Sequence, residues 1–419
     1  MFKTRNYKKF MLFWKVPRYE FRYPKSPLAT LLGCAMRRKV VDGEEINTFE
    51  NALSRYLGVR HVLLTPSGRM AFYLIMKAMG IEPGDEVILP AFTFPAIPNM
   101  CHIAGVKSVF VDVNIHTLNI DPSLVEDAIS SRTKAVVVNH MFGEPADVGA
   151  ISDICKKHNI DIIEDCAHAL GSEYMGRKTG TFGKASLFSF SMTKNINTLG
   201  GGFIATDEDV IIERVKTELS RYKPPNRLEL LRRAIKFEYL RMITSKPFFS
   251  LLIFPLIRRR RLAEGTNMLD EADSYEHKLM DGLPEECKTR FSNYQAVMGI
   301  EQLKRIDDYI DARNRSAALM RKILGQGDMG FQHGLPGSKS ALQSFPVMSR
   351  NKESLATRLV MSGIDFRETD MRNCAAMGLF GKKACPNAER VEDSIIYLPI
   401  FGRHNSSYMR RLRNLVNRT

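Results

Sequence analysis

Short apolar runs alternate regularly with amphipathic helical patterns between residues 41 and about 206 of this 419-residue chain. The strand-like runs lie at 62–64, 87–89, 108–113, 135–139, 161–164 and 186–190. Apolar runs without polar alternation are typical of strands buried on both faces, and the helices between them form the crossovers of a parallel sheet. The alternation therefore predicts an α/β fold with a large domain, in which helices cover a mostly parallel sheet.

Changes in composition and periodicity divide the rest of the chain. Residues 1–40 are expected to form a basic N-terminal arm, and residues 41–285 the large domain. A long helical pattern covers about 292–324. It lies in the last segment, 286–419, which is expected to contain this connecting helix and a smaller C-terminal α+β domain.

An insertion at about 221–261 combines many basic residues with the apolar run 248–257. The whole chain has a formal net charge of +15. The apolar run is too short to cross a bilayer, so it is interpreted as buried core, as a subunit contact, or as a peripheral contact of residues 248–261 with an anionic membrane. No nucleic-acid-binding motif is present, so no nucleic-acid partner is expected.

Seven cysteines are scattered along the chain, and no two of them form a CxxC motif. This pattern favours neither a disulfide framework nor a zinc site, and no metal is expected. The apolar stretch at 10–14 is shorter than the core of a signal peptide. The sequence therefore predicts a cytoplasmic location, with peripheral membrane contact as the open alternative.

Several polar residues directly follow the strand-like runs. Parallel sheets bind ligands beyond the carboxyl ends of their strands, so these residues are candidates for a functional site. They are Ser67, Thr93, His140, Asp165 and the stretch 191–194. Position and chemistry agree in predicting a site at this edge of the sheet.

Lys194 lies in a polar turn between a buried strand and three glycines. A lysine amine held away from water is a nucleophile toward a carbonyl, which is the requirement for a Schiff base. Asp165 ends another apolar run, where a carboxylate needs a cation or a hydrogen-bond donor, and a protonated pyridine nitrogen would meet that need. The alternatives are a surface lysine and a helix N-cap.

Ser67, Gly68 and Arg69 follow a strand and open a helix, whose backbone N–H groups could bind a phosphate. The hydroxyl of Ser189 could contact the same phosphate, or this serine could simply fit a crowded strand end. Phe94 could stack on a planar ring, although a phenylalanine in such a place is usually core.

Several ordered motifs resemble the DegT/DnrJ/StrS family of pyridoxal-phosphate-dependent sugar aminotransferases. They are SGRMAF, PGDEVILPAFTF, IEDCAHALGSEYMGRKTGTFG, SFSMTKN and GGGF. The match is close over about 45–210 and looser at 290–314 and 385–401. The resemblance implies the fold type I aminotransferase architecture and the cofactor pyridoxal 5'-phosphate.

Carried over by position, the resemblance implies two catalytic residues. Lys194 would bind the cofactor covalently and carry protons, and Asp165 would face the pyridine nitrogen. The other implied cofactor contacts are His168 near the phenolic oxygen, Gly68, Arg69 and Ser189 at the phosphate, and Phe94 against the ring. Family members are dimers with shared active sites, which makes Lys288 and Arg290 candidates for reaching into the neighbouring subunit.

The implied reaction transfers an amino group, with glutamate as the expected donor, to a keto sugar that is expected to be nucleotide-linked and to serve the biosynthesis of surface polysaccharides or secondary metabolites. Sugar dehydratases of the same family usually have histidine in place of this lysine, so Lys194 favours amino transfer. A membrane-surface protein with a vestigial cofactor site is the second alternative. The chain departs from the family pattern at Arg69, which replaces a threonine, and at 363–367, which lacks a histidine and a tyrosine.

Overall fold

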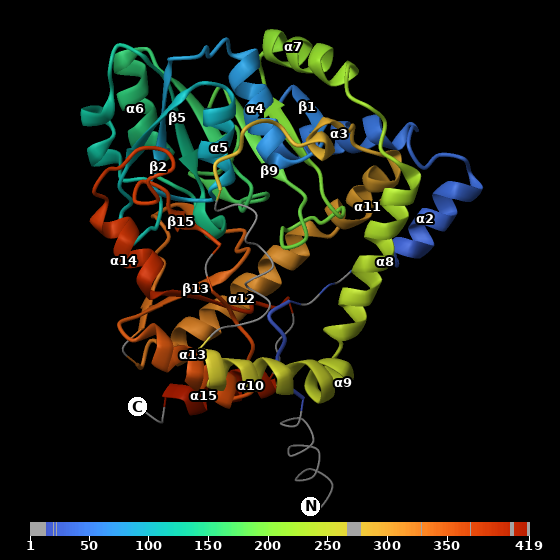
Figure 1. Ribbon diagram of the computed structural model, residues 1–419, viewed down its shortest axis with the longest axis vertical. Helices are drawn as coiled ribbons and strands as arrows, with labels where there is room; N and C mark the ends of the chain where they lie inside the picture. Colours follow the sequence, from blue (N-terminus) through green and yellow to red (C-terminus); the bar gives the residue numbers. More distant parts are fainter. Residues whose placement is uncertain are drawn as a thin grey trace, which may run out of the picture.

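The computed structural model describes residues 14–416 except 20, 22, 266–277, 328, 369 and 403–405. Residues 1–13 of the expected basic arm and a stretch after the insertion therefore lie outside the described residues. The described chain builds a large sheet with its helices, a second smaller sheet, and a helical segment along one edge of the molecule (Figure 1).

Seven strands form the large sheet in the order β1-β10-β9-β6-β5-β2-β4. The contacts from β9 to β4 are parallel, and β10 is antiparallel to both of its neighbours. The strands are β1 (His61–Thr65), β2 (Glu86–Pro90), β4 (Lys107–Val111), β5 (Thr133–Asn139), β6 (Asp161–Asp165), β9 (Ala185–Ser189) and β10 (Gly202–Thr206). The predicted mostly parallel sheet is confirmed.

Both faces of this sheet are covered. Val87 and Ile88 are neighbours on β2, yet they belong to hydrophobic cores on opposite faces, because successive side chains of a strand alternate. The covering helices are α3 (Glu45–Leu57), α4 (Gly68–Ala78), α5 (Ala96–Ile103), α6 (Val148–His158) and α7 (Asp209–Ser220). Short 3-10 helices lie at Pro122–Leu124, Glu126–Ala128, Met141–Gly143 and Glu285–Lys288.

The connection to the second sheet consists of two helices, α11 (Asn293–Leu303) and α12 (Ile306–Leu324). The prediction of one helix over 292–324 is wrong at this point, because Arg305 has φ −125° and ψ 8°, outside the helical range. Gln302, at the end of α11, is buried and exchanges hydrogen bonds with the backbone of Asn197. The break follows a residue that holds the loop after β9.

The second sheet is antiparallel, with the order β11-β13-β16-β14. Its elements are β11 (Met329–Phe331), β13 (Phe345–Ser349), β14 (Arg367–Glu368), β16 (Ile395–Leu398), α13 (Lys352–Met361), α14 (Pro386–Ser394) and α15 (Ser406–Val416). Short strand pairs join β3 (Phe92–Thr93) to β15 (Arg372–Asn373), and β7 (Glu173–Tyr174) to β8 (Arg177–Lys178) and β12 (Ser338–Lys339). This part has the expected α+β composition.

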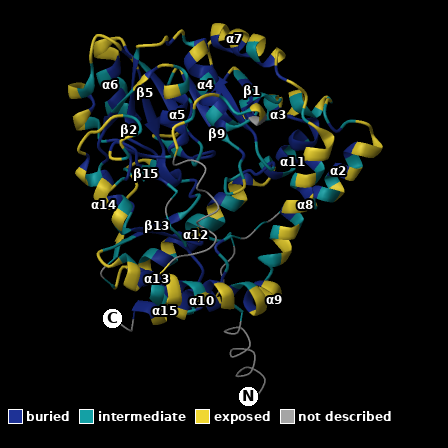
Figure 2. Ribbon diagram, in the orientation of Figure 1, coloured by how far each residue is buried: buried dark blue, intermediate teal, exposed yellow. Residues whose placement is uncertain are grey.

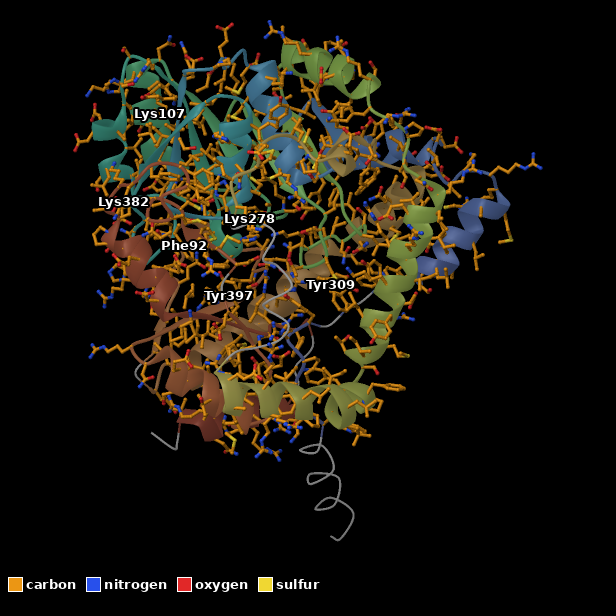
Figure 3. The ribbon with its side chains drawn as sticks, in the orientation of Figure 1. Phe92, Lys107, Lys278, Tyr309, Lys382 and Tyr397 are labelled. Atoms are coloured by element: carbon orange, nitrogen blue, oxygen red, sulfur yellow. The ribbon has the colours of Figure 1, made fainter. Side chains whose placement is uncertain are left out.

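The two sheets meet near Tyr397, which is labelled in the middle of Figure 3. Its ring packs edge to face against Phe142 at a centroid distance of 4.8 Å. Tyr397 is on β16, and Phe142 follows β5 of the large sheet. The carboxyl edge of the large sheet therefore faces the smaller sheet.

The basic insertion forms helices α8 (Arg227–Ile243), α9 (Lys246–Phe248) and α10 (Phe254–Glu264), with a π-helical stretch, Phe249–Ile253, between the last two. Helix α2 (Pro27–Met36) packs on α8. Phe249, Phe254 and Ile257 are buried in the core of the second sheet, so the apolar run is core on one face. No single described helix is long and apolar enough to cross a membrane; α8 and residues 246–264 pass that test only as a pair bent by 63°.

The N-terminal segment from residue 14 docks between the second sheet and the insertion. Val16 forms a β-bridge with Ile364, and the amide N–H of Lys15 donates to the Ser250 hydroxyl at 2.8 Å. The buried guanidinium of Arg18 forms two hydrogen bonds of 2.9 Å with the Asp365 carboxylate. This stretch of the expected arm is therefore part of the folded protein.

Candidate active site

A cavity of about 830 Å³ opens at the carboxyl ends of β5, β6 and β9. The first turn of α4, the loop after β9, helix α8 and the residues before α11 also line it. Its position is the sheet edge at which the sequence predicts a site. The cavity brings together Gly68, Arg69, Phe94, Asp165, His168, Ser189 and Lys194.

Asp165 is the last residue of β6 and is partly exposed only where it lines the cavity. Burial raises the pKa of its carboxyl group above the usual value. A 3.0 Å hydrogen bond from the Ala167 amide and the charges of Lys194 and His140 oppose this rise. The carboxylate is short of stabilising partners, and a cation bound in the cavity would supply one.

The loop that carries Lys194 is fixed from outside the large sheet. Asn195 donates to the carbonyl oxygens of Leu170 and Ala341 at 3.1 and 2.8 Å, and it accepts from Arg313 at 2.5 Å. Gln343 donates to the Thr193 carbonyl at 2.9 Å. Side chains on both sides of Lys194 thus hold the lysine in place at the cavity wall.

His168 follows the end of β6 by three residues and also lines the cavity. Burial, together with the charges of Lys194 and Arg367, lowers its pKa well below the usual value, so the imidazole is neutral at pH 7. Its Nδ1 accepts from the Phe142 amide at 3.2 Å. The single ring proton is therefore on Nε2, which is available as a hydrogen-bond donor.

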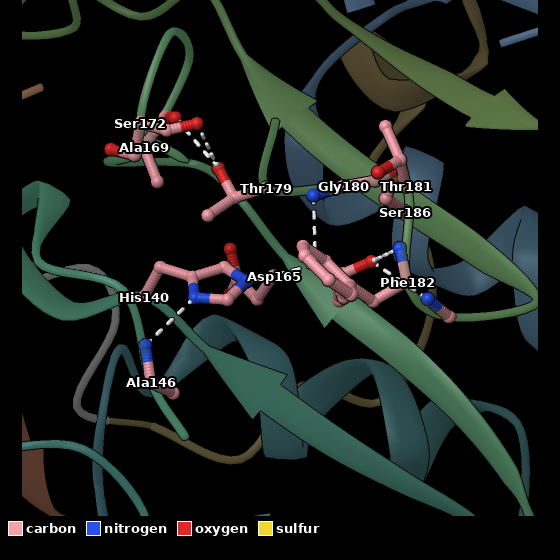
Figure 4. Close-up of polar contacts among 12 residues, drawn as sticks. His140, Ala146, Asp165, Ala169, Ser172, Thr179, Gly180, Thr181, Phe182 and Ser186 are labelled. Carbon is pink, nitrogen blue, oxygen red and sulfur yellow. Dashed lines mark hydrogen bonds and ion pairs between the residues drawn. The ribbon is translucent and has the colours of Figure 1, made fainter. Parts of the chain in front are cut away.

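A buried hydrogen-bond network around Glu164 supports the strand end behind Asp165, and Figure 4 shows its members His140, Gly180 and Phe182. Glu164 accepts from His140 Nε2 at 3.0 Å and from the amides of Gly180, Phe182 and Gly183 at 2.6 to 2.8 Å. Burial alone would raise the Glu164 pKa, but His140 and the amides outweigh it, and the pKa is lowered.

Glu164, His140 and Cys166 lie close enough together to hold a metal ion. However, the Ala146 amide donates to His140 Nδ1 at 3.0 Å, so both ring nitrogens are engaged. Both Glu164 oxygens also accept hydrogen bonds. These groups already satisfy one another without an ion.

The first turn of α4 packs against the end of β9. Ser67 caps the helix by accepting the Met70 amide at 3.3 Å. A side chain at Gly68 would approach the Ser189 Cβ to 3.1 Å, and one at Gly202 would approach the Gly68 nitrogen to 2.6 Å. The glycines allow this close approach, and Gly68 at the helix N-terminus lines the cavity together with Ser189, an arrangement suited to binding an anion.

The remaining predicted residues occupy different places. Phe94 lines the cavity, as does Arg290, whose guanidinium lies 3.5 Å from the Asp42 carboxylate. Lys288 does not line the cavity and pairs with Glu285 at 2.8 Å. The roles of Lys288 and Arg290 toward a neighbouring subunit remain predictions.

Sequence reasoning missed several residues of the cavity wall. Asn139 ends β5 beside Asp165, and among the described residues neither polar atom of its buried amide has a hydrogen-bond partner. The strand-end rule that identified Asp165 could also have found it. Arg367 lies between the rings of Tyr19 and Tyr397, 5.9 Å from each centroid, and pairs with Asp370. Arg367 and Tyr19 come from segments distant in the sequence, and no local pattern marks them as site residues.

A model of the DegT/DnrJ/EryC1/StrS aminotransferase family matches residues 25–224 and 258–416. The chain belongs to this family. Residues 225–257, which hold α8, α9 and the π-helical stretch, fall between the two matched segments. The insertion expected from the sequence is therefore outside the family model for most of its length.

Curated relatives match parts of the chain. GDP-perosamine synthase of Caulobacter vibrioides is 32% identical over 273 residues, which cover 65% of this chain and 60% of that protein. GDP-perosamine synthase of Vibrio cholerae is 37% identical over 172 residues, covering 41% of this chain and 47% of that protein. Both alignments span less than two thirds of the relative's length.

Solved structures show the same fold. Helicobacter pylori PseC, an aminotransferase involved in the biosynthesis of pseudoaminic acid, has a TM-score of 0.76 and 23% identity, covering 96% of this chain and 98% of its own. GDP-4-keto-6-deoxy-D-mannose-3-dehydratase of E. coli, solved with bound hydrated pyridoxal phosphate, has a TM-score of 0.75 and 19% identity, covering 96% and 99%. They confirm the predicted aminotransferase architecture.

Proposed function

We propose that this protein is a pyridoxal-phosphate-dependent aminotransferase that moves an amino group from glutamate to a nucleotide-linked keto sugar. The observation that carries the proposal is the pairing of Asp165 and Lys194 in one cavity, close enough for the lysine charge to act on the carboxyl pKa. Family membership supports the same reaction class.

The residues present fit the cofactor. Asp165 offers a poorly stabilised carboxylate, which a protonated ring nitrogen would complement. His168 Nε2–H is a donor suited to the phenolic oxygen. The Gly68 turn and Ser189 form an anion site for the phosphate, with Arg69 nearby. Pyridoxal phosphate would supply an aldehyde that carries the amino group and a ring that accepts electrons.

Each of the cavity's side chains has a separate role in this reaction. The Lys194 amine would take a proton from the carbon that bears the donor nitrogen. In the acceptor half of the reaction, it would return a proton to the sugar carbon that receives the nitrogen. Asp165 would hold the proton on the ring nitrogen, and His168 would donate a hydrogen bond to the phenolic oxygen. Phe94 would pack against the ring. Tyr19 and Arg367, which reach the cavity from the N-terminus and β14, restrict the access of water.

A nucleotide-linked substrate is supported by the charge of the cavity wall. Five basic residues line the cavity, and three acidic residues do so. The basic residues are Arg69, Lys194, Arg233, Arg290 and Arg367, and the acidic residues are Asp165, Glu229 and Asp370. Planar guanidinium groups suit the paired phosphates of a sugar nucleotide. The names of the relatives, GDP-perosamine synthases, point to the same class of acceptor and to polysaccharide biosynthesis.

We further propose a cytoplasmic homodimer. Arg290 is exposed at the cavity wall, which suits a residue shared with a neighbouring subunit, and Lys288 is two residues away. The seven cysteines are buried and reduced, as a reducing compartment allows. Light scattering of the purified protein tests the dimer, and a monomer at micromolar concentration would contradict it.

The reaction is tested by incubating the purified protein with glutamate, pyridoxal phosphate and GDP-4-keto-6-deoxymannose, followed by mass spectrometry. We expect an amino sugar nucleotide and one equivalent of 2-oxoglutarate. Lys194→Ala should abolish both, whereas Lys184→Ala, which changes an exposed pair with Asp161, should retain them. A deoxygenated product without amino transfer would favour the dehydratase, and neither product across a panel of keto sugar nucleotides would overturn the proposal.

A further inference from the structure

The outward face of residues 246–264 is apolar. Its first four large side chains fall within nine residues, the fifth follows six residues later, and each is between 44% and 58% exposed. They are Phe248, Leu251, Leu252, Leu256 and Leu262, and we call them the outer stripe. Five large apolar side chains exposed on one short helical segment indicate a surface that a partner covers.

The opposite face of the same helices is firmly packed. Phe249, Phe254 and Ile257 are buried in the core of the second sheet. Arg261 is buried between Glu353 and Glu368, with hydrogen bonds of 2.5 and 2.6 Å. The outer stripe is therefore held on a fixed helix along one edge of the molecule, where Figure 1 shows α9 and α10 and Figure 2 colours much of their surface as exposed.

Positive charge flanks the outer stripe. Residues 246–264 contain five basic residues and one acidic residue. Glu264 pairs with Arg260, while Arg258 and Arg259 are exposed. Burial and the charges of Arg411 and Arg258 lower the pKa of Lys15, which indicates a positive potential at this edge.

The sequence that precedes the described residues is also basic. Residues 1–13 contain four basic residues and no acidic one, with the apolar sequence FMLF at their end. The chain that continues them passes next to the π-helical stretch, because the Lys15 amide bonds to Ser250. A basic segment thus joins the protein beside the outer stripe.

A second copy of the chain would suit this face poorly. In a two-fold dimer of this helix, Lys246 at one end and Arg258 and Arg259 toward the other would meet the same basic residues of the partner. Like charges opposed across an interface cost affinity and prevent pairing. Phospholipid headgroups carry the complementary charge, and acyl chains take up the leucines.

We propose that the outer stripe is a peripheral contact with an anionic membrane surface. The helix would lie in the plane of the interface, with Leu251, Leu252 and Leu256 about 5–10 Å deep at the boundary of headgroups and acyl chains. Arg258 and Arg259 would bind lipid phosphates. Most of this face falls outside the family model, so the inference does not depend on the proposed amino transfer.

Vesicle flotation tests the proposal on the full-length protein. We expect flotation with vesicles of phosphatidylcholine and phosphatidylserine, and at least tenfold weaker binding to phosphatidylcholine alone. Raising the salt concentration should weaken the interaction, because screening reduces the attraction between exposed charges. Wild-type protein that stays unbound with anionic vesicles at low salt would overturn the proposal.

Two pairs of variants locate the contact. Leu251→Ser with Leu252→Ser should weaken flotation at least tenfold, whereas Leu124→Ser with Val210→Ser, which also removes two exposed apolar side chains, should leave it unchanged. Arg258→Gln with Arg259→Gln should weaken binding to anionic vesicles more than Lys156→Gln with Lys216→Gln, two exposed lysines elsewhere.

The remaining outcomes are also decisive. Circular dichroism and thermal melting check that each variant is folded, and glutamate-dependent amino transfer checks the active site separately. Removal of residues 1–13 should reduce binding but not abolish it; if it abolishes binding while the leucine variant binds normally, the outer stripe is not the contact. Concentration-dependent self-association that the leucine variant loses would assign this face to a second copy instead.

Discussion

The end of β6 and the outer stripe break the usual rule of burial in opposite directions. At the end of β6, Glu164 and His140 are fully buried although both can carry charge. Along the outer stripe, large apolar side chains such as Leu251 and Leu252 face solvent. Within the fold, both carboxylate oxygens of Glu164 accept hydrogen bonds, which offset the cost of its burial. The exposed leucines of the outer stripe are not covered by any described part of the chain.

This difference separates two kinds of functional surface. A buried charge must be satisfied within the fold, or the protein does not fold, so its partners are visible in the structure. An exposed apolar face costs much less and can wait for an external partner. Asp165 lies between these cases, because it is partly exposed at the cavity wall and its carboxylate accepts a hydrogen bond from the Ala167 amide.

The largest expected effect is on the reaction. Asp165→Asn should lower the rate of amino transfer by about 10³-fold or more, toward the upper range for a group that controls a proton in the reaction. Because the folded-state pKa of Asp165 is raised, its ionisation lowers stability as the pH rises from the unfolded-state pKa through the folded-state pKa. The asparagine variant should therefore be at least as stable as wild type at pH 7, measured by urea unfolding without cofactor.

A loss of stability in Asp165→Asn equal to the loss in a core variant would show that Asp165 is structural. Asp165 and Glu164 would then both be residues that stabilise the fold, and the proposed difference between them would be wrong. The matched conservative variant Asp165→Glu should recover part of the activity, since it restores the charge.

Glu164→Gln should destabilise the fold by about 3–5 kcal/mol, because two buried N–H donors would lose their acceptor at about 1–3 kcal/mol each. An amide nitrogen would replace one carboxylate oxygen and oppose the amides of Gly180, Phe182 or Gly183. The Glu164 pKa is lowered in the folded protein, so its contribution is present above the unfolded-state pKa and lost as the pH falls through the folded-state pKa. Urea unfolding should show a difference from wild type that narrows in acid.

Glu126→Gln is the control for this prediction, because Glu126 pairs with Lys157 and His158 on the surface. It should change the unfolding free energy much less than Glu164→Gln. Equal losses in the two variants would contradict the view that burial makes the Glu164 network important.

Phe254→Ala tests the inner face of the helix that carries the outer stripe. Phe254 is buried in the core of the second sheet, and its removal should cost about 3–5 kcal/mol in unfolding free energy. Thermal or urea unfolding measures the loss. A cost below about 1 kcal/mol would mean that the insertion is only loosely attached, and that the outer stripe is not a fixed surface.

The smallest expected effect is that of Leu252→Ser on stability. Leu252 is more than half exposed, so the unfolding free energy should change by no more than about 0.5 kcal/mol. The same substitution contributes to the loss of vesicle binding proposed above. A large destabilisation would place Leu252 in the core and end the contrast between the two faces.

The sequence could predict the sheet and the centre of the site, because both follow from local patterns. Asp165 and Lys194 each follow a buried apolar run, and parallel strands bring such positions to one edge. Tyr19, Arg233 and Arg367 could not be predicted in this way, because they reach the cavity from the N-terminal segment, the insertion and the second sheet. Their approach depends on tertiary packing.

The insertion shows the same limit. Its composition indicates apolar and basic residues together, but a helix with apolar residues all around gives no sign of which face is covered. The structure separates Phe254, which is buried, from Leu256, which is exposed. The break between α11 and α12 carries no helix-breaking glycine or proline that the sequence could reveal, and Gln302 just before it is held by hydrogen bonds to the distant Asn197.

The ion pair of Arg18 and Asp365 joins residues 347 positions apart. At about 5–20 residues per second, a ribosome takes roughly 17–70 s to add that many residues. During this time the Arg18 guanidinium has no Asp365 carboxylate to pair with. The contact that holds the segment next to Tyr19, a residue of the cavity wall, therefore forms only after Asp365 has been made.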